Sequence, residues 1–276
     1  MLTSLQKKIV KLLAPYKSEE SYFAGSSTLN TKLLRFSNDM DIFHDEYEQC
    51  ILHFKSDIEI LEKNGLYIIQ KRNMQNGDIG EVDVFHGNEK TTIQWATDSA
   101  FRFFPLVQDP IFGFKLHHVD AATNKILALA GRGDVIRDYY DVCNMIFEKE
   151  PVVAYIWAAC GKDPGYSPHT LLEWMSRHTK FQEESLLLIQ AEKKFSLHEC
   201  KEIFMTMADE AREKFSYAPC NEIGTLYLKF SDRSVFFPSL SDFEEGNFVR
   251  HRGSIRGSMP QFVDIPDAIS RNSLKF

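Results

Sequence analysis

The sequence Asn-Asp-Met-Asp-Ile-Phe at residues 38–43 alternates polar and apolar side chains, the pattern of a β-strand with one buried face. Side chains two apart on a strand point to the same side, so Asp39 and Asp41 share a face while Met40 and Ile42 point into the core. Two carboxylates on one face repel each other unless a cation lies between them, and a divalent metal ion is the usual solution. The pattern predicts a metal-binding strand, with an edge strand of solvated acids as the alternative.

A Gly-Ser-Ser-Thr segment at residues 25–28 precedes this strand. Gly25 would let the backbone come close to a phosphate, and Ser26 and Ser27 would offer hydroxyl donors. Residues 29–36 indicate a brief helix whose first turn would face the same anion. The segment predicts a phosphate-binding loop, although a turn with a helix N-cap has the same composition.

A second acidic strand is predicted at residues 79–85, where Glu81 and Asp83 alternate with apolar residues. If this strand pairs beside the first, Asp83 joins Asp41 at the metal site. Carboxylates from two strands could then hold one or two Mg²⁺ ions, which activate an attacking hydroxyl and stabilise a leaving pyrophosphate.

Beyond the strands, a predicted helix carries Lys125, which is placed to meet a triphosphate as a point charge. Arg132 and Arg137 would contact phosphate or pair with Asp138 and Asp141. For Arg137, Asp138 and Asp141, the alternative is an ion network on the helix surface.

The remaining pattern predicts an α+β protein of two domains, with the boundary near His117: residues 1–117 and a mainly helical part, residues 118–276. Further strands are expected at residues 21–24, 66–70 and 91–96, with a hairpin turn at residues 76–77. The helices are expected at residues 1–13, 46–64, 121–130, 135–147, 168–177, 181–191 and 197–214. Residues 224–237 indicate a short hairpin, and residues 244–276 a loop-rich tail.

Composition limits the class of protein. The chain has 276 residues, a formal net charge of -7 and five cysteines without the spacing of a zinc site. The charge argues against nucleic-acid binding over the whole surface but permits a local site. Free thiols and the lack of a transmembrane or signal pattern predict a cytoplasmic protein that does not bind membranes.

Taken together and in this order, the motifs resemble those of the AbiEii-type nucleotidyltransferases, the toxins of type IV toxin–antitoxin systems, within the DNA polymerase β-like superfamily. The likeness covers residues 20–145 and includes Lys-Ile-Leu-Ala-Leu-Ala-Gly-Arg at residues 125–132 and Arg-Asp-Tyr-Tyr-Asp-Val at residues 137–142. It implies a mixed β-sheet flanked by helices, with a helical C-terminal domain that completes the active site.

The resemblance also implies roles for single residues. Those expected to act in catalysis are Asp39, Asp41, Asp83, Lys125 and Asp138, and the first three would bind Mg²⁺ or Mn²⁺. Those expected to bind the nucleoside triphosphate (NTP) are Gly25, Ser26, Ser27, Lys125, Arg132 and Arg137. A cognate antitoxin is the partner that the family implies.

Three functions are compatible with these residues. The first is transfer of a nucleoside monophosphate to tRNA, another RNA or a protein, and the basic run at residues 250–256 could hold an RNA acceptor. The second keeps the chemistry but uses a small acceptor such as an aminoglycoside. The third is an inactive nucleotidyltransferase scaffold that binds a partner, although retention of Asp39, Asp41, Asp83 and Lys125 argues against it.

Overall fold

A computed structural model describes residues 2–29, 35–74, 79–132, 135–177, 181–191 and 194–262 of the chain. The hairpin turn expected at residues 76–77 and most of the helix expected at residues 29–36 lie outside these ranges. Among the described residues, no helix combines the length and hydropathy that crossing a bilayer requires.

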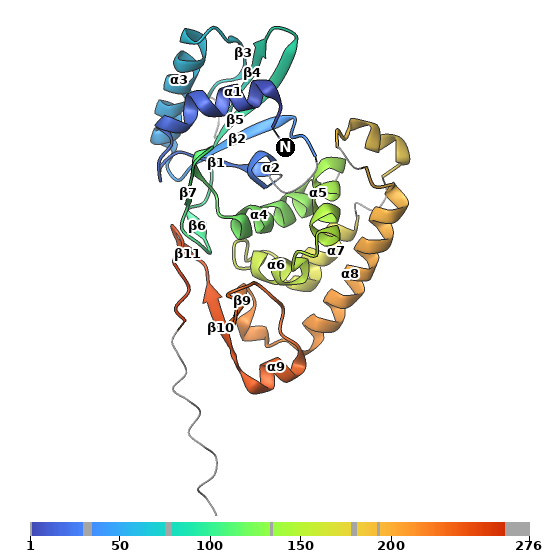
Figure 1. The fold of residues 1–276 in the computed structure, drawn as a ribbon. Helices are drawn as coiled ribbons and strands as arrows, with labels where there is room; N and C mark the ends of the chain where they lie inside the picture. The colour runs from blue at the N-terminus through green and yellow to red at the C-terminus, as the bar shows by residue number, and fades with distance from the viewer. Residues whose placement is uncertain are drawn as a thin grey trace, which may run out of the picture.

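The first half of the chain forms a mixed seven-stranded sheet with the strand order β3-β4-β5-β2-β1-β8-β7 (Figure 1). Its strands are β1 (Tyr22–Ala24), β2 (Asp39–His44), β3 (Tyr67–Arg72), β4 (Ile79–His86), β5 (Glu89–Thr97), β7 (Val107–Asp109) and β8 (Gly113–Lys115). The central strand β2 is parallel to β5 and antiparallel to β1. The predicted α+β class and mixed sheet are confirmed.

The two faces of this sheet contact different hydrophobic cores. Met40 and Ile42 of β2 are fully buried in a core with α1 (Ser4–Leu13) and α3 (Tyr47–Lys63), whose apolar stripes cover that face. Strand β1 alternates between the cores, because Phe23 belongs to this one while Tyr22 and Ala24 belong to the other. The acidic side chains of β2 therefore face the side where the C-terminal helices lie.

The rest of the chain is mainly helical, as predicted, and packs as one apolar cluster beneath the sheet (Figure 1). Its elements are α4 (His118–Gly131), α5 (Ile136–Phe147), α6 (Val152–Ala159), α7 (Pro168–Ser176), the 3₁₀ turns at Glu183–Leu188 and Cys220–Glu222, α8 (Leu197–Tyr217) and α9 (Leu240–Glu245). Helix α6 was not predicted, because it is apolar on every side and buried throughout, so it has no amphipathic period.

The structure corrects two expectations about the C-terminal region. Strand β9 (Thr225–Lys229), in the region expected to be a short hairpin, pairs with β10 (Phe248–Arg252). Strand β10 lies in residues 244–276, which were expected to be a loop-rich tail. A short strand β11 (Ser254–Ile255) then pairs with β6 (Phe101–Arg102). Most of the basic run thus lies within β10 and β11, and Arg250 pairs with Glu222 while Arg252 donates to the carbonyl of Asn221.

Candidate functional site

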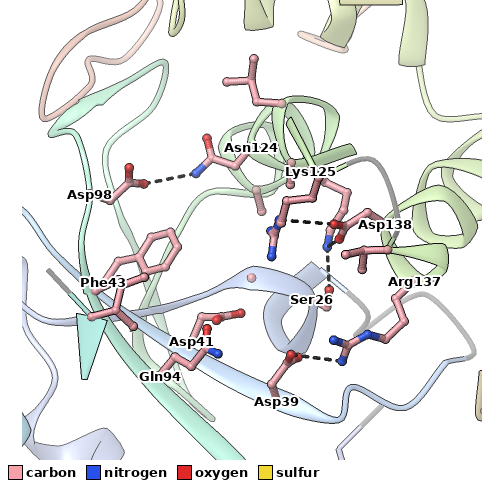
Figure 2. A pocket seen from close by; sticks show the side chains of 18 of the residues that line it. Ser26, Asp39, Asp41, Phe43, Gln94, Asp98, Asn124, Lys125, Arg137 and Asp138 are labelled. Atoms are coloured by element: carbon pink, nitrogen blue, oxygen red, sulfur yellow. Dashed lines mark hydrogen bonds and ion pairs between the residues drawn. The ribbon is translucent and has the colours of Figure 1, made fainter. Parts of the chain in front are cut away.

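A cavity of about 580 Å³ lies between the acidic face of β2 and helices α4 and α5. Figure 2 shows Asp39, Asp41 and Gln94 on the sheet, opposite Lys125 and Asp138 on the helices. The cavity therefore brings together most of the residues that the sequence marked as functional. Its lining includes Gly25, Ser26, Asp39, Asp41, Lys125, Arg132, Arg137 and Asp138.

The two acids of β2 lie on one face of the sheet and line this cavity. Burial and the neighbouring carboxylate of Asp39 raise the pKa of Asp41 to about 7. Asp39 accepts a hydrogen bond from Arg137 Nη1 at 3.2 Å. The surroundings of Asp41 thus disfavour its negative charge, although Lys125 and Arg132 work in the opposite direction.

Gly25 lies directly against Asp41. Its φ is +66°, in the left-handed region that favours glycine, and a Cβ atom at this position would overlap the Asp41 carboxylate. The short helix α2 (Gly25–Leu29) therefore begins in van der Waals contact with the acidic strand. This close approach explains why glycine, rather than another turn residue, precedes the serines.

Next to Gly25, Ser26 joins a buried network of charged groups. Lys125 Nζ donates to Ser26 Oγ at 2.9 Å and to Asp138 Oδ1 at 2.7 Å. Ser26 Oγ in turn donates to Asp141 Oδ2 at 2.9 Å, and Lys125 also lies 3.3 Å from that oxygen. The network holds the ammonium group of Lys125 at the cavity wall, beside the serine.

Arg35 completes this network from the segment that leads into β2. Its Nε and Nη2 donate to the two carboxylate oxygens of Asp141 at 2.7 and 2.8 Å, with both side chains almost fully buried. Burial works to raise the pKa of Asp141, but Arg35 and Lys125 outweigh it and hold the pKa below its ordinary value. Asp138 and Asp141 are thus interior residues, and the alternative of a helix-surface network is wrong.

The hydroxyl of Ser27 points away from the cavity. Ser27 Oγ donates to the carbonyl of Ala24 at 3.1 Å, and Thr28 Oγ1 donates to the carbonyl of Gly25 at 3.0 Å. Of the three side chains, only that of Ser26 lines the cavity. The expectation that Ser26 and Ser27 both present hydroxyl groups to a phosphate is therefore wrong for Ser27.

Asp83 does not join the acids of β2. Strand β5 lies between β4 and β2, so the assumption that the two acidic strands are neighbours is wrong. Asp83 instead pairs with Lys71 at 2.8 Å and Lys90 at 2.7 Å and accepts from Thr92 Oγ1, and these groups lower its pKa to about 2 against the effect of burial. Among the described residues, no group of three His, Cys, Asp or Glu side chains converges on a metal site.

The two arginines of the cavity differ in how they are held. Arg137 pairs with Asp39, whereas the Arg132 side chain is 62% exposed and lies 3.5 Å from Asp138. Both line the cavity. Their guanidinium groups add positive charge at the end that also holds Lys125.

The opposite end of the cavity has a different character, because Phe43, Ile79 and Ala96 form an apolar wall there. Asn124 donates to Asp98 Oδ2 at 3.4 Å and accepts from Lys162 at 2.8 Å, which fixes its amide. Figure 2 shows this pair and Phe43 on the far side of Asp41 from Arg137. The cavity thus has a cationic end and an apolar end, with Asp39 and Asp41 between them.

Comparisons with known proteins add little to this geometry. No protein-family model matches the chain, and no curated protein matches it in sequence. The chain is similar in structure to MenT4, a nucleotidyltransferase toxin from Mycobacterium tuberculosis. The match covers 75% of this chain and 89% of MenT4, with 16% identity and a TM-score of 0.38.

The sequence did not mark Arg35, Asp98 or Asn124 as functional. A sequence signal for the Arg35–Asp141 pair does exist. Arg35 lies shortly before the acidic strand, and Asp141 lies on an apolar helix, where a buried aspartate needs a cationic partner. No local pattern distinguishes Asp98 and Asn124, because their proximity depends on the packing of α4 against the end of β5.

Proposed function

We propose that the chain is a metal-dependent nucleotidyltransferase that moves a nucleoside monophosphate from an NTP to an acceptor. One observation carries this proposal: two carboxylates of one strand, Asp39 and Asp41, share a cavity with Gly25, Ser26 and the buried Lys125. The resemblance of the motifs to AbiEii-type enzymes supports the narrower proposal of a toxin with a cognate antitoxin and a tRNA 3′ end, or another RNA, as acceptor.

The acids of β2 fit a divalent cation. The negative charge of Asp41, which burial and the neighbouring Asp39 carboxylate make unfavourable, would be stabilised by Mg²⁺ or Mn²⁺, which prefer carboxylate oxygens. The amide of Gln94 on β5, which is paired directly with Asp41 of β2, could contribute a further oxygen. A bound ion supplies charge stabilisation for the phosphoryl group and activates the attacking hydroxyl.

The two ends of the cavity suggest how the donor lies. Ser26, Lys125 and the arginines suit the phosphates, because ammonium and guanidinium groups bind them as charge-assisted donors. Phe43 and its apolar neighbours suit the base, which is planar and largely apolar on its faces. The α-phosphate would then lie over Asp39 and Asp41.

The buried acids of α5 act through Lys125. Asp138 and Asp141 hold its ammonium group, and burial alone would lower the pKa of Lys125, but the two acids raise it above the ordinary value. Lys125 therefore stays protonated and ready to meet the negative charge of the leaving pyrophosphate.

The test is a transfer assay with purified protein, labelled NTPs, Mg²⁺ and total RNA. Asp39→Ala and Asp41→Ala should lower transfer by at least 10²-fold, as expected when a metal ligand is lost. Asp83→Asn is the matched control, because this acid lies outside the cavity and should leave transfer within a few-fold of the wild type. Transfer that persists in the β2 variants would overturn the proposal.

A further inference from the structure

A row of paired side chains leads sideways from Asp41 across the sheet. Asp41 of β2 is paired with Gln94 of β5, and Gln94 with Glu81 of β4. Directly paired residues point to the same side of a sheet, and neighbouring strands lie about 4.8 Å apart. Gln94 lines the cavity beside Asp41 (Figure 2), whereas Glu81 is not part of the lining. The amide of Gln94 therefore lies between an acid of the cavity and an acid behind it.

The contact between Gln94 and Glu81 fixes the orientation of the Gln94 amide. Gln94 Nε2 donates to Glu81 Oε2 at 3.0 Å. An ionised carboxylate can only accept hydrogen bonds, so the NH₂ end of the amide must face Glu81. The carbonyl oxygen Oε1, which is the end of an amide that can bind a cation, is thereby turned away from Glu81.

Lys71 of β3 holds Glu81 from its other side. Lys71 Nζ lies 3.4 Å from Glu81 Oε1, the oxygen that Gln94 does not contact. The Glu81 side chain is only 14% exposed, so the ammonium group compensates a carboxylate that has lost most of its contact with solvent. Each oxygen of Glu81 thus has a partner of its own, and the carboxylate is fixed beside the amide.

An amide at the position of Gln94 suits a cation site that already holds two acids. Hard divalent cations bind amide carbonyl oxygens as well as carboxylates. Burial and the Asp39 carboxylate already disfavour the negative charge of Asp41, and a third acid paired with Asp41 would add to this repulsion. The neutral oxygen of Gln94 adds a ligand without adding a charge.

We propose that Glu81 is a positioning residue of the metal site, which holds the Gln94 amide so that its carbonyl oxygen is a ligand of the divalent cation beside Asp39 and Asp41. This inference rests on the proposed function, because it requires a cation at the acids of β2. Metal ligands are oriented by hydrogen bonds from residues behind them, and loss of such a residue typically costs 10–100-fold in metal affinity. Glu81 has this role without contacting the ion.

The test is the affinity of the full chain for Mn²⁺, measured by electron paramagnetic resonance without nucleotide. Glu81→Gln should weaken Mn²⁺ binding by about tenfold, because a second amide can meet Gln94 with its oxygen or its nitrogen and no longer selects one orientation. Asp83→Asn is the matched control. It also removes a carboxylate that contacts Lys71 from the same strand, but the partners of Asp83 are Lys71, Lys90 and Thr92. Equal affinities of the two variants would overturn the proposal.

A double variant shows whether Glu81 acts through Gln94. Gln94→Ala should weaken Mn²⁺ binding by about as much as Glu81→Gln does, because each change removes the oriented carbonyl oxygen. The variant with both changes should bind Mn²⁺ as Gln94→Ala does, because the carboxylate has no amide left to orient. Additive losses would overturn the proposal, since Glu81 would then act on the ion by its charge alone.

Kinetics separate a positioning role from a general loss of structure. With Glu81→Gln, the Mg²⁺ concentration that gives half-maximal transfer should rise about tenfold, while kcat should recover at saturating Mg²⁺. A kcat that stays low at every Mg²⁺ concentration would contradict the proposal.

The same titrations distinguish this inference from the proposed function. Absence of Mn²⁺ binding in the wild type, or binding that Asp39→Asn and Asp41→Asn leave unchanged, would contradict the metal-dependent nucleotidyltransferase, and the role of Glu81 with it. Mn²⁺ binding that is lost in the β2 variants but unaffected by Glu81→Gln would overturn only the role of Glu81.

Discussion

At the scale of single residues, the close contact between Gly25 and Asp41 shapes the centre of the cavity, because it allows the Asp41 carboxylate to lie directly against the backbone. The backbone of Gly25 occupies the left-handed region, and the carboxylate of Asp41 fills the space that a side chain would need. Both features belong to residues that sequence patterns identified, since glycine before serine and alternating acids are local signals. Their contact, however, depends on the pairing of β1 with β2.

Gly25→Ala should therefore lower transfer sharply and reduce stability by roughly 1–3 kcal/mol, because residue 25 has a left-handed backbone that strains alanine and the new methyl group displaces the Asp41 carboxylate. Thermal unfolding and the transfer assay measure the two effects. Gly87→Ala, also at positive φ but with open space around it, controls for backbone strain alone. Equal loss of transfer in the two variants would show that contact with Asp41 is unimportant.

The raised pKa of Asp41 predicts a dependence on pH. Because burial and Asp39 raise the folded-state pKa to about 7, this carboxyl destabilises the metal-free fold as pH rises from about 4 to about 7. Asp41→Asn should raise Tm at pH 8 by a few degrees without metal, and by little at pH 4. If Mg²⁺ binds here, wild-type affinity should fall as pH drops below 7. Identical Tm profiles for the two proteins would contradict this assignment.

At the scale of elements, the Arg35–Asp141 pair fixes α5 to the segment that enters β2. This bidentate pair is nearly inaccessible to solvent, so removing one partner leaves an uncompensated buried charge. Arg35→Ala should cost about 3–5 kcal/mol of stability and lower transfer by displacing Lys125 and Ser26. Arg35→Lys should recover only part of the lost stability and part of the lost transfer activity, because an ammonium group cannot form the bidentate contact.

The double variant Arg35→Ala with Asp141→Ala provides the control for this pair. Removing both charges together should cost less than the sum of the two single changes, because no buried charge is left alone. Chemical denaturation of the four proteins gives the coupling energy. Additive costs would show that the two side chains act independently.

The helices and strands were predicted well where the periodicity of their apolar residues was clear. Strands β2 to β5 and helices α1, α3, α4, α5, α7 and α8 all lie near their predicted positions, because each has one apolar face. The strand order could not be predicted, because sequence gives no direct signal for β5 lying between β2 and β4. That one fact separates Asp83 from the cavity. The residues over 181–191 form only a 3₁₀ segment, since exposed Leu187 and Leu188 break the helical pattern.

At the scale of the whole molecule, Asp45 links three distant parts of the chain. It accepts from Tyr22 on β1 at 3.0 Å and pairs with Arg102 on β6 at 2.7 Å, and Arg256 after β11 lies 3.9 Å away. Sequence spacing gives no hint of this link, because the partners lie far apart along the chain. The buried part of this cluster, Tyr22, Asp45 and Arg102, therefore ties β1 and β6 to the end of β2, and the partly exposed Arg256 reaches it from the C-terminal part of the chain.

Asp45→Ala should lower stability by about 3–5 kcal/mol, because it leaves the guanidinium of Arg102 buried without its carboxylate. Asp209→Ala removes an exposed partner of Arg212 on α8 and should cost less than about 1 kcal/mol. Urea unfolding of both variants makes the comparison. Similar midpoints for the two would show that the Asp45 cluster contributes no more than a surface pair.

The pairing of β6 with β11 has a consequence for how the protein is made. All strands of the main sheet precede residue 116, whereas β11 and His251, which contacts the carbonyl of Phe103 at 2.6 Å, emerge from the ribosome much later. During synthesis, the backbone groups of β6 that pair with β11 stay unpaired while the intervening helices are translated. The last step of folding is thus expected to be the long-range pairing of β6 with β11, after most of the cavity has formed. Between the synthesis of β6 and that of β11, the nascent chain is most exposed to mispairing or chaperone capture.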